Sequence, residues 1–344
     1  MNPQWQDFLI AQGAVLADGR VSHFGNPAQE LQAAAQGTII ADLSHFGLLQ
    51  VEGADAATFL QGQVTNDVKL LNGSNSHYAG YCTPKGRLLA MFLAFAHHDH
   101  LHLQLNGALT ESVLKRLKMY VLRSKVTITD VSDSIIRIGL AGANAEATLR
   151  KVFSEIPNEA HQLVNLETAN ILRLPGATPR YEILVSAENA AALWSQLQSG
   201  CTAVGAECWD WLEIHAGIPD ITPATLEAFV PQMVNLDLLG GINFKKGCYT
   251  GQEIVARTHY LGKVKRRTYL AHLVTDQAPK PGDNLFGADT AEPVGQIVRA
   301  AAAPHGGFDV LAELRSESVA AGAIRWPAPE GSTLTIAELP YPVE

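Results

Sequence analysis

The feature that most limits the possible folds is the way strand-like and helix-like patterns are mixed along the chain. Residues 88–96 form an unbroken apolar run, and residues 101–105 alternate strictly, as strands do. Residues 110–120 instead place apolar side chains at helical spacing. Further strand and helix patterns follow without a repeated strand–helix unit, and no phosphate loop or dinucleotide fingerprint accompanies them. This mixture predicts an α+β fold.

The pattern changes after about Lys263. Short apolar runs alternate there with Pro- and Gly-containing turns, which is typical of a small all-β barrel. With 344 residues the chain is long enough for two or three domains. We therefore predict an α+β core over residues 1–263 and a C-terminal β-barrel over residues 264–344.

Composition excludes several classes of protein. The net charge of −9 argues against direct nucleic-acid binding, which usually requires a basic excess. The start of the chain lacks a secretory signal, and the longest apolar run of nine residues cannot span a membrane. The four cysteines show no spacing typical of a disulfide framework, a zinc site or a stable iron–sulfur cluster. These features predict a cytoplasmic protein with free thiols, no membrane contact and no bound metal.

A cysteine stands just before a predicted helix in the run Lys245-Lys246-Gly247-Cys248-Tyr249-Thr250-Gly251-Gln252-Glu253. Thr250 and Glu253 have the spacing of a capping box, and Tyr249 and Ile254 that of a hydrophobic staple. The helix is expected to end before Gly262.

The position of Cys248 favours a thiolate over a thiol. The positive end of the helix and the neighbouring Lys245 and Lys246 both stabilise negative charge on sulfur. The alternative is that Cys248 is a small buried side chain without reactivity, which is the more common fate of a free cysteine. Local chemistry leaves both readings open.

Three segments carry a resemblance to a known family: Phe229-Val230-Pro231-Gln232, the run from Lys246 to Glu253, and Ala256-Arg257. Together they resemble the signature of the YgfZ family of folate-binding proteins, which is related to the T-protein (aminomethyltransferase) of the glycine cleavage system. The resemblance implies interleaved α+β subdomains and a C-terminal β-barrel around a central folate cleft.

The resemblance also implies roles for individual residues. Cys248 would be the reactive thiol, Lys246 would tune it, and Gln252 and Glu253 would fix its loop. Cys82 would be a second thiol.

The cofactor implied by the family is tetrahydrofolate. Phe46 and Trp209 match positions where the family places aromatic side chains that line the folate, although Trp is more common than Phe at the first. Arg257 would take part in binding the folate. A flat pterin is well served by aromatic faces and a few polar groups at its edge.

Two clusters of charged or polar residues admit more than one interpretation. Seven basic residues occur between 245 and 267, with Glu253 as the single acid, and they form either a solvated face or a rim that attracts the glutamate tail of folate or a short RNA. His98, His100 and His102 share one strand face near a hairpin tip. We interpret them as exposed polar residues rather than as a metal site.

The sequence departs from the T-protein where that family carries catalytic and binding carboxylates. Ala90 and Met91 stand in place of an aspartate pair, and Thr178-Pro179-Arg180 replaces a turn that contains a glutamate. Proton transfer at the folate nitrogen requires a group within hydrogen-bond reach, which alanine and methionine cannot supply. We therefore expect folate binding without aminomethyl transfer.

The function implied by the resemblance is support of iron–sulfur cluster assembly or repair, and thereby of tRNA modification. Its partners would be folate and iron–sulfur enzymes, including those that modify tRNA. Two alternatives stay open: a true aminomethyltransferase, and a direct tRNA-binding module that acts through the basic residues.

Overall fold

The computed structural model describes residues 1–97, 99–287 and 292–343. The chain divides into two compact units and passes between them several times. Unit 1 comprises Met1–Ala57, Lys69–His77 and Leu93–Leu212, and unit 2 comprises Thr58–Val68, Tyr78–Phe92 and Glu213–Glu344. The division into domains at residue 263 stays a prediction.

A six-stranded sheet forms the centre of unit 1. Its strand order is β10-β11-β12-β9-β3-β13, in which β13 pairs with β3 in parallel and the other neighbouring strands pair antiparallel. The strands are β3 (Thr38–Asp42), β9 (Ile135–Gly142), β10 (Leu163–Asn165), β11 (Asn170–Leu174), β12 (Arg180–Ser186) and β13 (Thr202–Val204).

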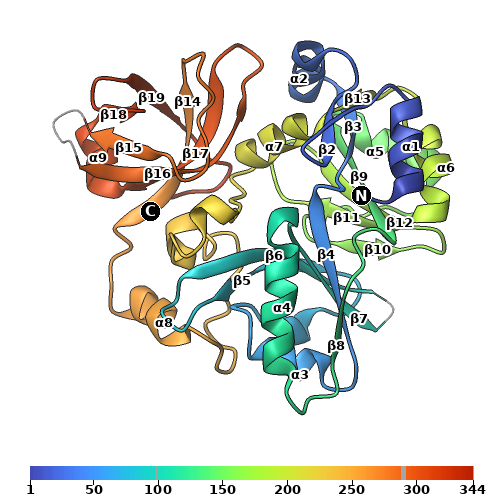
Figure 1. The fold of residues 1–344 in the computed structure, drawn as a ribbon, viewed down its shortest axis with the longest axis horizontal. Coiled ribbons are helices and arrows are strands. Elements are labelled where there is room, and N and C mark those ends of the chain that lie inside the picture. The colour runs from blue at the N-terminus through green and yellow to red at the C-terminus, as the bar shows by residue number, and fades with distance from the viewer. Residues whose placement is uncertain (98, 288–291, 344) are drawn as a thin grey trace. The chain divides into compact units, whose positions relative to one another are not determined.

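One face of this sheet packs on helices. Ile136, Ile138 and Leu140 of β9 share a buried cluster with Ile183 of β12 and with Trp194. The cluster takes in three helices, α1 (Pro3–Ala11), α5 (Ala145–Val152) and α6 (Ala187–Leu197), of which α1 and α6 lie side by side in Figure 1. Because side chains alternate along a strand, the residues between these apolar ones face the opposite side of the sheet.

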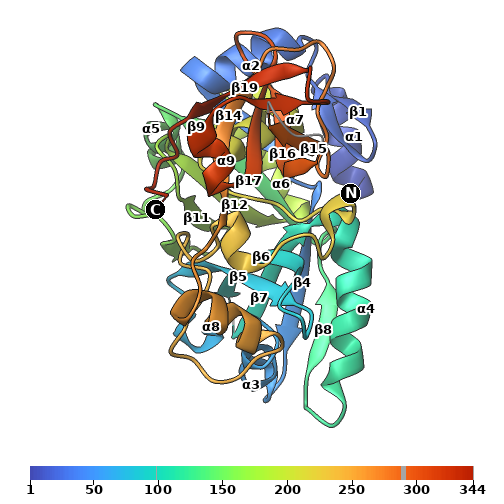
Figure 2. The same ribbon diagram turned by 90° about the vertical axis from the view of Figure 1, so that its left-hand side faces the viewer.

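A second sheet has the order β5-β6-β7-β4-β8. Its strands are β4 (Phe46–Glu52), β5 (Ser76–Cys82), β6 (Leu88–His97), β7 (His100–Asn106) and β8 (Thr127–Asp130). The long apolar run forms β6 and the alternating run forms β7, as the sequence predicts. Helix α4 (Thr110–Val121) lies against β4 and β8 (Figure 2).

The C-terminal part of unit 2 is a closed six-stranded barrel of order β14-β17-β16-β15-β18-β19, drawn from orange to red in Figure 1. Its strands are β14 (Arg266–Leu273), β15 (Asn284–Gly287), β16 (Pro293–Ala302), β17 (Phe308–Arg315), β18 (Ile324–Trp326) and β19 (Ser332–Ala337). Alternating apolar residues of these strands fill the interior. The predicted α+β fold with a C-terminal β-barrel is therefore confirmed.

The other strands are β1 (Val15–Ala17) and β2 (Arg20–His23), and the other α-helices are α2 (Pro27–Gln36), α3 (Ala56–Gln61), α7 (Ala206–His215), α8 (Gln252–Tyr260) and α9 (Ser316–Ala321). Among the residues described, no helix is both long and apolar enough to cross a membrane.

Candidate functional site

Cys248 lies on an exposed loop of unit 2 that leads into α8. Its thiol is open to solvent, whereas Lys246 and Tyr249 on either side of it are buried. The interpretation of Cys248 as a buried side chain is therefore wrong, and its reactivity stays a prediction. The loop turns its flanking side chains inward and presents the sulfur outward.

The start of α8 differs from the prediction. The helix begins at Gln252, with Gly251 as its N-cap at φ 85° and no side-chain cap hydrogen bond. A Cβ at Gly251 would lie 2.5 Å from the Thr83 carbonyl oxygen, so this close approach requires glycine. The predicted capping box of Thr250 and Glu253 is wrong, and with it the staple of Tyr249 and Ile254. Packing on the neighbouring turn, rather than a side-chain cap, determines where the helix begins.

Lys246 anchors the loop. Its side chain is 7% exposed, and its Nζ donates to the carbonyl oxygens of Gln61 at 2.7 Å and Val64 at 2.5 Å. The same nitrogen lies 4.9 Å from the centre of the Tyr249 ring. Burial lowers the pKa of the Lys246 ammonium to about 8, against the opposing effect of the Asp67 carboxylate. These contacts hold the loop in place. The role of Lys246 in tuning the reactivity of Cys248 stays a prediction.

Sequence reasoning missed a second anchor, Gln232. It is fully buried, and its Nε2 donates to the Val255 carbonyl oxygen at 2.7 Å, which ties α8 to the segment 229–232. The family-like motif around Phe229 gave the signal, because a buried amide needs partners. The loop-fixing roles of Gln252 and Glu253 stay predictions.

Two other cysteines have the opposite environment. Burial raises the pKa values of the Cys82 and Cys208 thiols to about 12, with neighbouring carboxylates adding to the shift at Cys208. Cys82 lies at the end of β5 and is almost completely covered. It is therefore a poor nucleophile as long as it stays covered.

A buried polar face lies on the six-stranded sheet of unit 1, opposite the helices. We define the polar sheet face as Arg137 of β9 and Arg180 and Glu182 of β12, which are at most 1% exposed, together with Gln104 of β7. Gln104 Nε2 donates to a Glu182 carboxylate oxygen at 2.9 Å. Burial lowers the pKa of the Arg137 guanidinium, and the Glu182 carboxylate opposes that shift. Buried charges of both signs thus stabilise one another.

The two aromatic residues predicted to line the folate both contact this face. Arg137 Nη2 donates to the Phe46 carbonyl oxygen at 2.6 Å. The Arg180 guanidinium lies 5.7 Å from the centre of the Trp209 ring. The Trp209 ring also covers Gly139, where a Cβ would lie 2.6 Å from the indole. Phe46 is half-buried and Trp209 is 1% exposed. The structure therefore links both residues to one set of buried charges.

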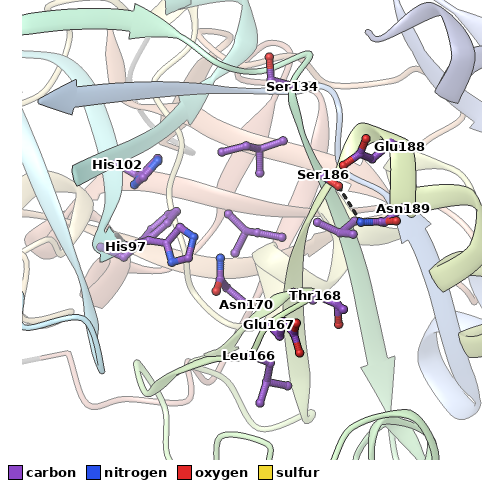
Figure 3. Close-up of a pocket in the computed structure, with 15 residues that line it drawn as sticks. His97, His102, Ser134, Leu166, Glu167, Thr168, Asn170, Ser186, Glu188 and Asn189 are labelled. Atoms are coloured by element: carbon purple, nitrogen blue, oxygen red, sulfur yellow. Dashed lines mark hydrogen bonds between the residues drawn. The ribbon is translucent and has the colours of Figure 1, made fainter. Parts of the chain in front are cut away.

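A pocket of about 350 Å³ opens further along the same strands (Figure 3). His102 lines it and lies two residues from Gln104 on β7, and Leu184 lines it and lies two residues from Glu182 on β12. Because side chains alternate along a strand, each lies on the same side of its strand as its partner in the polar sheet face. Two carboxylates, Glu167 and Glu188, also line it. None of the side chains predicted for the site lines this pocket.

The basic run does not form a single surface. Lys246 is buried, Arg266 pairs with Glu313, and Arg267 pairs with Asp237. The exposed members are Lys245, Arg257, Lys263 and Lys265. The expectation of seven cations on one rim is therefore wrong.

The histidine cluster is also corrected in part. His98 lies outside the described residues. His102 is buried rather than exposed, and its ring stacks on Phe95 with centroids 5.1 Å apart. In the described part of the chain, no group of three or more His, Cys, Asp or Glu side chains is placed to hold a metal ion.

The structure places Ala90 and Met91 in β6, where both are buried. Neither can accept or donate a proton at a bound ligand.

Comparison with known proteins agrees with the motifs. The GCVT N-terminal domain model matches residues 11–243. A tRNA-modifying protein YgfZ from Pectobacterium atrosepticum is 33% identical over 320 residues, which cover 92% of this chain and 95% of the relative. One from Sodalis glossinidius is 31% identical over 306 residues, covering 88% and 93%. This chain belongs to the YgfZ family.

The fold of this YgfZ-family member is also found in a solved structure. The glycine cleavage system aminomethyltransferase T from Bartonella henselae aligns with a TM-score of 0.75, over 99% of this chain and 97% of its own. The two sequences are 19% identical, so the likeness concerns the fold alone.

Sequence reasoning overlooked the polar sheet face. A signal was present, because Arg137 interrupts one otherwise apolar strand and Arg180 and Glu182 occupy alternate positions at the start of another. In a sheet covered on both faces, a charge at such a position is buried and must be paired.

Proposed function

We propose that this chain is a folate-binding protein that supports iron–sulfur enzymes, including those that modify tRNA. Family membership supports this proposal, since its relatives are named as tRNA-modifying proteins. The structural observation that carries it is the polar sheet face, which combines buried charges, two adjoining aromatic residues and an open pocket along the same strands.

In this proposal the polar sheet face recognises the pterin edge of tetrahydrofolate. A pterin presents several hydrogen-bond donors and acceptors, and buried sites use few polar groups to read such an edge. Glu182 and Gln104 accept from the ligand, and Arg137 and Arg180 donate. Trp209 acts through Arg180, because its ring is covered. Phe46 supplies an aromatic face. The role of Arg257 in binding the folate stays a prediction.

Cys248 is the reactive thiol of the proposed function. It is exposed, and Lys246 and Gln232 hold the loop and the helix next to it. A thiol presented on a fixed loop is suited to contact a protein or cluster partner from solvent. Cys82 does not assist it in the covered state described above.

A titration with tetrahydrofolate tests the ligand. Binding should quench tryptophan fluorescence in the wild-type protein, and Glu182→Gln should weaken binding at least tenfold, because one charged acceptor is lost. Asp210→Asn, a matched change of an acid on α7, should bind normally. Unchanged binding in Glu182→Gln would place the ligand elsewhere.

The second candidate, an aminomethyltransferase, is favoured by the shared fold alone. We propose that it does not apply, because Ala90 and Met91 lack the required carboxylate. General acid–base catalysis is typically worth about 10²–10⁴-fold in rate. Incubation with aminomethylated lipoyl carrier and tetrahydrofolate should yield no methylene-tetrahydrofolate above background. Turnover near that of a true T-protein would favour the second candidate.

A further inference from the structure

The end of helix α8 carries a group of aromatic side chains that open to solvent. Tyr260 is 64% exposed and the next residue, Leu261, is 84% exposed. His259 stacks on Phe244 with ring centroids 3.8 Å apart and planes 14° apart, and Tyr260 meets His259 edge-on at 4.7 Å. Phe244 is half-buried, so its ring supports the exposed rings of His259 and Tyr260 from the protein side. Large exposed rings in a fixed arrangement are more typical of a binding surface than of a folding role.

Cations precede and follow these rings in the sequence. The exposed lysines are Lys245, next to Phe244, and Lys263 and Lys265, just after α8. Within the described residues none of their side chains forms an ion pair. We define the α8 surface as Lys245, His259, Tyr260, Leu261, Lys263 and Lys265. This positive surface stands out in a protein with a net charge of −9.

We infer that the α8 surface binds unpaired nucleotides of RNA. Aromatic side chains stack on bases whatever their sequence, and lysines neutralise the phosphates between them. An acidic protein partner would pair with the cations, whereas unpaired RNA supplies both a base to stack on each ring and a phosphate for each lysine. The surface contains neither Phe46, Trp209 nor Arg257, so the inference does not depend on folate binding.

This inference revises the expectation drawn from net charge. The acidic remainder of the chain repels RNA, so binding is confined to one surface and is sensitive to salt. For three lysines on single-stranded RNA, the logarithm of the binding constant should fall with the logarithm of the salt concentration with a slope of about −2. This slope is far shallower than the one that seven cations would give.

The end of helix α4 offers a matched control. It also combines an exposed tyrosine, Tyr120, with exposed lysines, Lys118 and Lys125. Its other exposed apolar side chains, Met119 and Leu122, are aliphatic and cannot stack on a base. The same substitutions at both sites thus separate stacking from charge.

The experiment measures fluorescence anisotropy of a labelled, unstructured RNA oligonucleotide between about 50 and 200 mM salt. Tyr260→Ala should weaken binding roughly tenfold, and Tyr260→Phe should restore it, because the ring is what stacks. The double variant Lys263→Glu with Lys265→Glu should reduce the magnitude of the slope of log binding constant against log salt concentration by roughly 1.4. Tyr120→Ala should leave the affinity unchanged, and Lys118→Glu with Lys125→Glu should reduce the salt dependence less.

Three results would overturn the inference. One is absence of RNA binding by the wild-type protein at the lowest salt. Another is equal loss in the α4 and α8 variants, which would show charge attraction alone. The third is displacement of RNA by polyglutamate together with normal binding by Tyr260→Ala, which would indicate an acidic protein partner. Folate titration of the same variants should be normal, so that failure of this inference is distinguishable from failure of the proposed function.

Discussion

The polar sheet face of unit 1 and the Cys248 loop of unit 2 use charge in opposite ways. On the sheet, Arg137 and Glu182 are completely buried and stabilise one another. On the loop, the charged Lys246 is buried so that the thiol beside it can be exposed. In the proposed function the first region binds a ligand out of water, and the second presents a nucleophile to a partner in solution.

The difference shows that burial has to be assigned residue by residue at a functional site. Cys248 and Lys246 are two residues apart, yet one faces solvent and the other is hydrogen-bonded inside. Charge and reactivity therefore follow from which side chain the backbone turns inward. The following predictions test that contrast.

The largest expected effect concerns thiol accessibility. At pH 8 an alkylating reagent should label Cys248 at least about 1000-fold faster than Cys82 or Cys208, whose pKa values are raised to about 12 by burial. Cys201 should react at an intermediate rate, because partial burial raises the pKa of its thiol as well. Mass spectrometry of timed samples measures each site. Equal rates for Cys248 and Cys82 would remove the contrast.

Glu182→Leu tests the buried charges. It leaves Arg137 without its main opposing charge, so the free energy of unfolding should fall by about 3–5 kcal/mol in urea denaturation. Glu182→Gln, which retains an acceptor for Gln104, should cost clearly less. A Leu variant as stable as the wild type would show that the polar sheet face needs no internal pairing.

Gly251→Ala tests how the thiol loop is positioned. The added Cβ would meet the Thr83 carbonyl oxygen at 2.5 Å, and φ 85° is unfavourable for alanine, so we expect a loss of about 1–3 kcal/mol. Gly247→Ala, on the same loop, has no atom within 4 Å of its added Cβ and should be nearly neutral. Similar stabilities for the two variants would contradict packing as the determinant of the helix start.

The smallest effect, counted per pH unit, is the pH dependence at Lys246. Burial lowers the pKa of this ammonium from 10.5 to about 8, so between these values the unfolded chain holds a proton that the folded chain has released. Wild-type stability should therefore rise with pH in this window relative to Lys246→Met, by at most about 1.4 kcal/mol per pH unit. Below about pH 8 the difference should be constant. A difference that falls between pH 8 and 10.5 would reverse the assignment.

Much of the fold could be predicted, because hydrophobic periodicity reports burial directly. The runs at 88–96 and 101–105 became β6 and β7, and the change of pattern after Lys263 marked the barrel. The start of α8 could not be predicted, since Gly251 is required by the Thr83 carbonyl oxygen, which is distant in sequence. Local capping rules do not include such a contact.

Site residues that belong to a sequence motif could be predicted, whereas residues that are brought together only by tertiary contacts could not. Cys248 stood out because its run is long and specific. The role of Lys246 did not, because its partners are carbonyl groups of residues 61 and 64. Arg137, Arg180 and Glu182 become a group only when β9 and β12 pair in register.

The most direct test of the central claim is the activity of [4Fe–4S] enzymes in a strain that lacks this protein. Wild-type protein and the buried-thiol variant Cys82→Ala should both restore activity, whereas Cys248→Ala should restore little although it folds and binds tetrahydrofolate normally. Full restoration by Cys248→Ala would contradict the account.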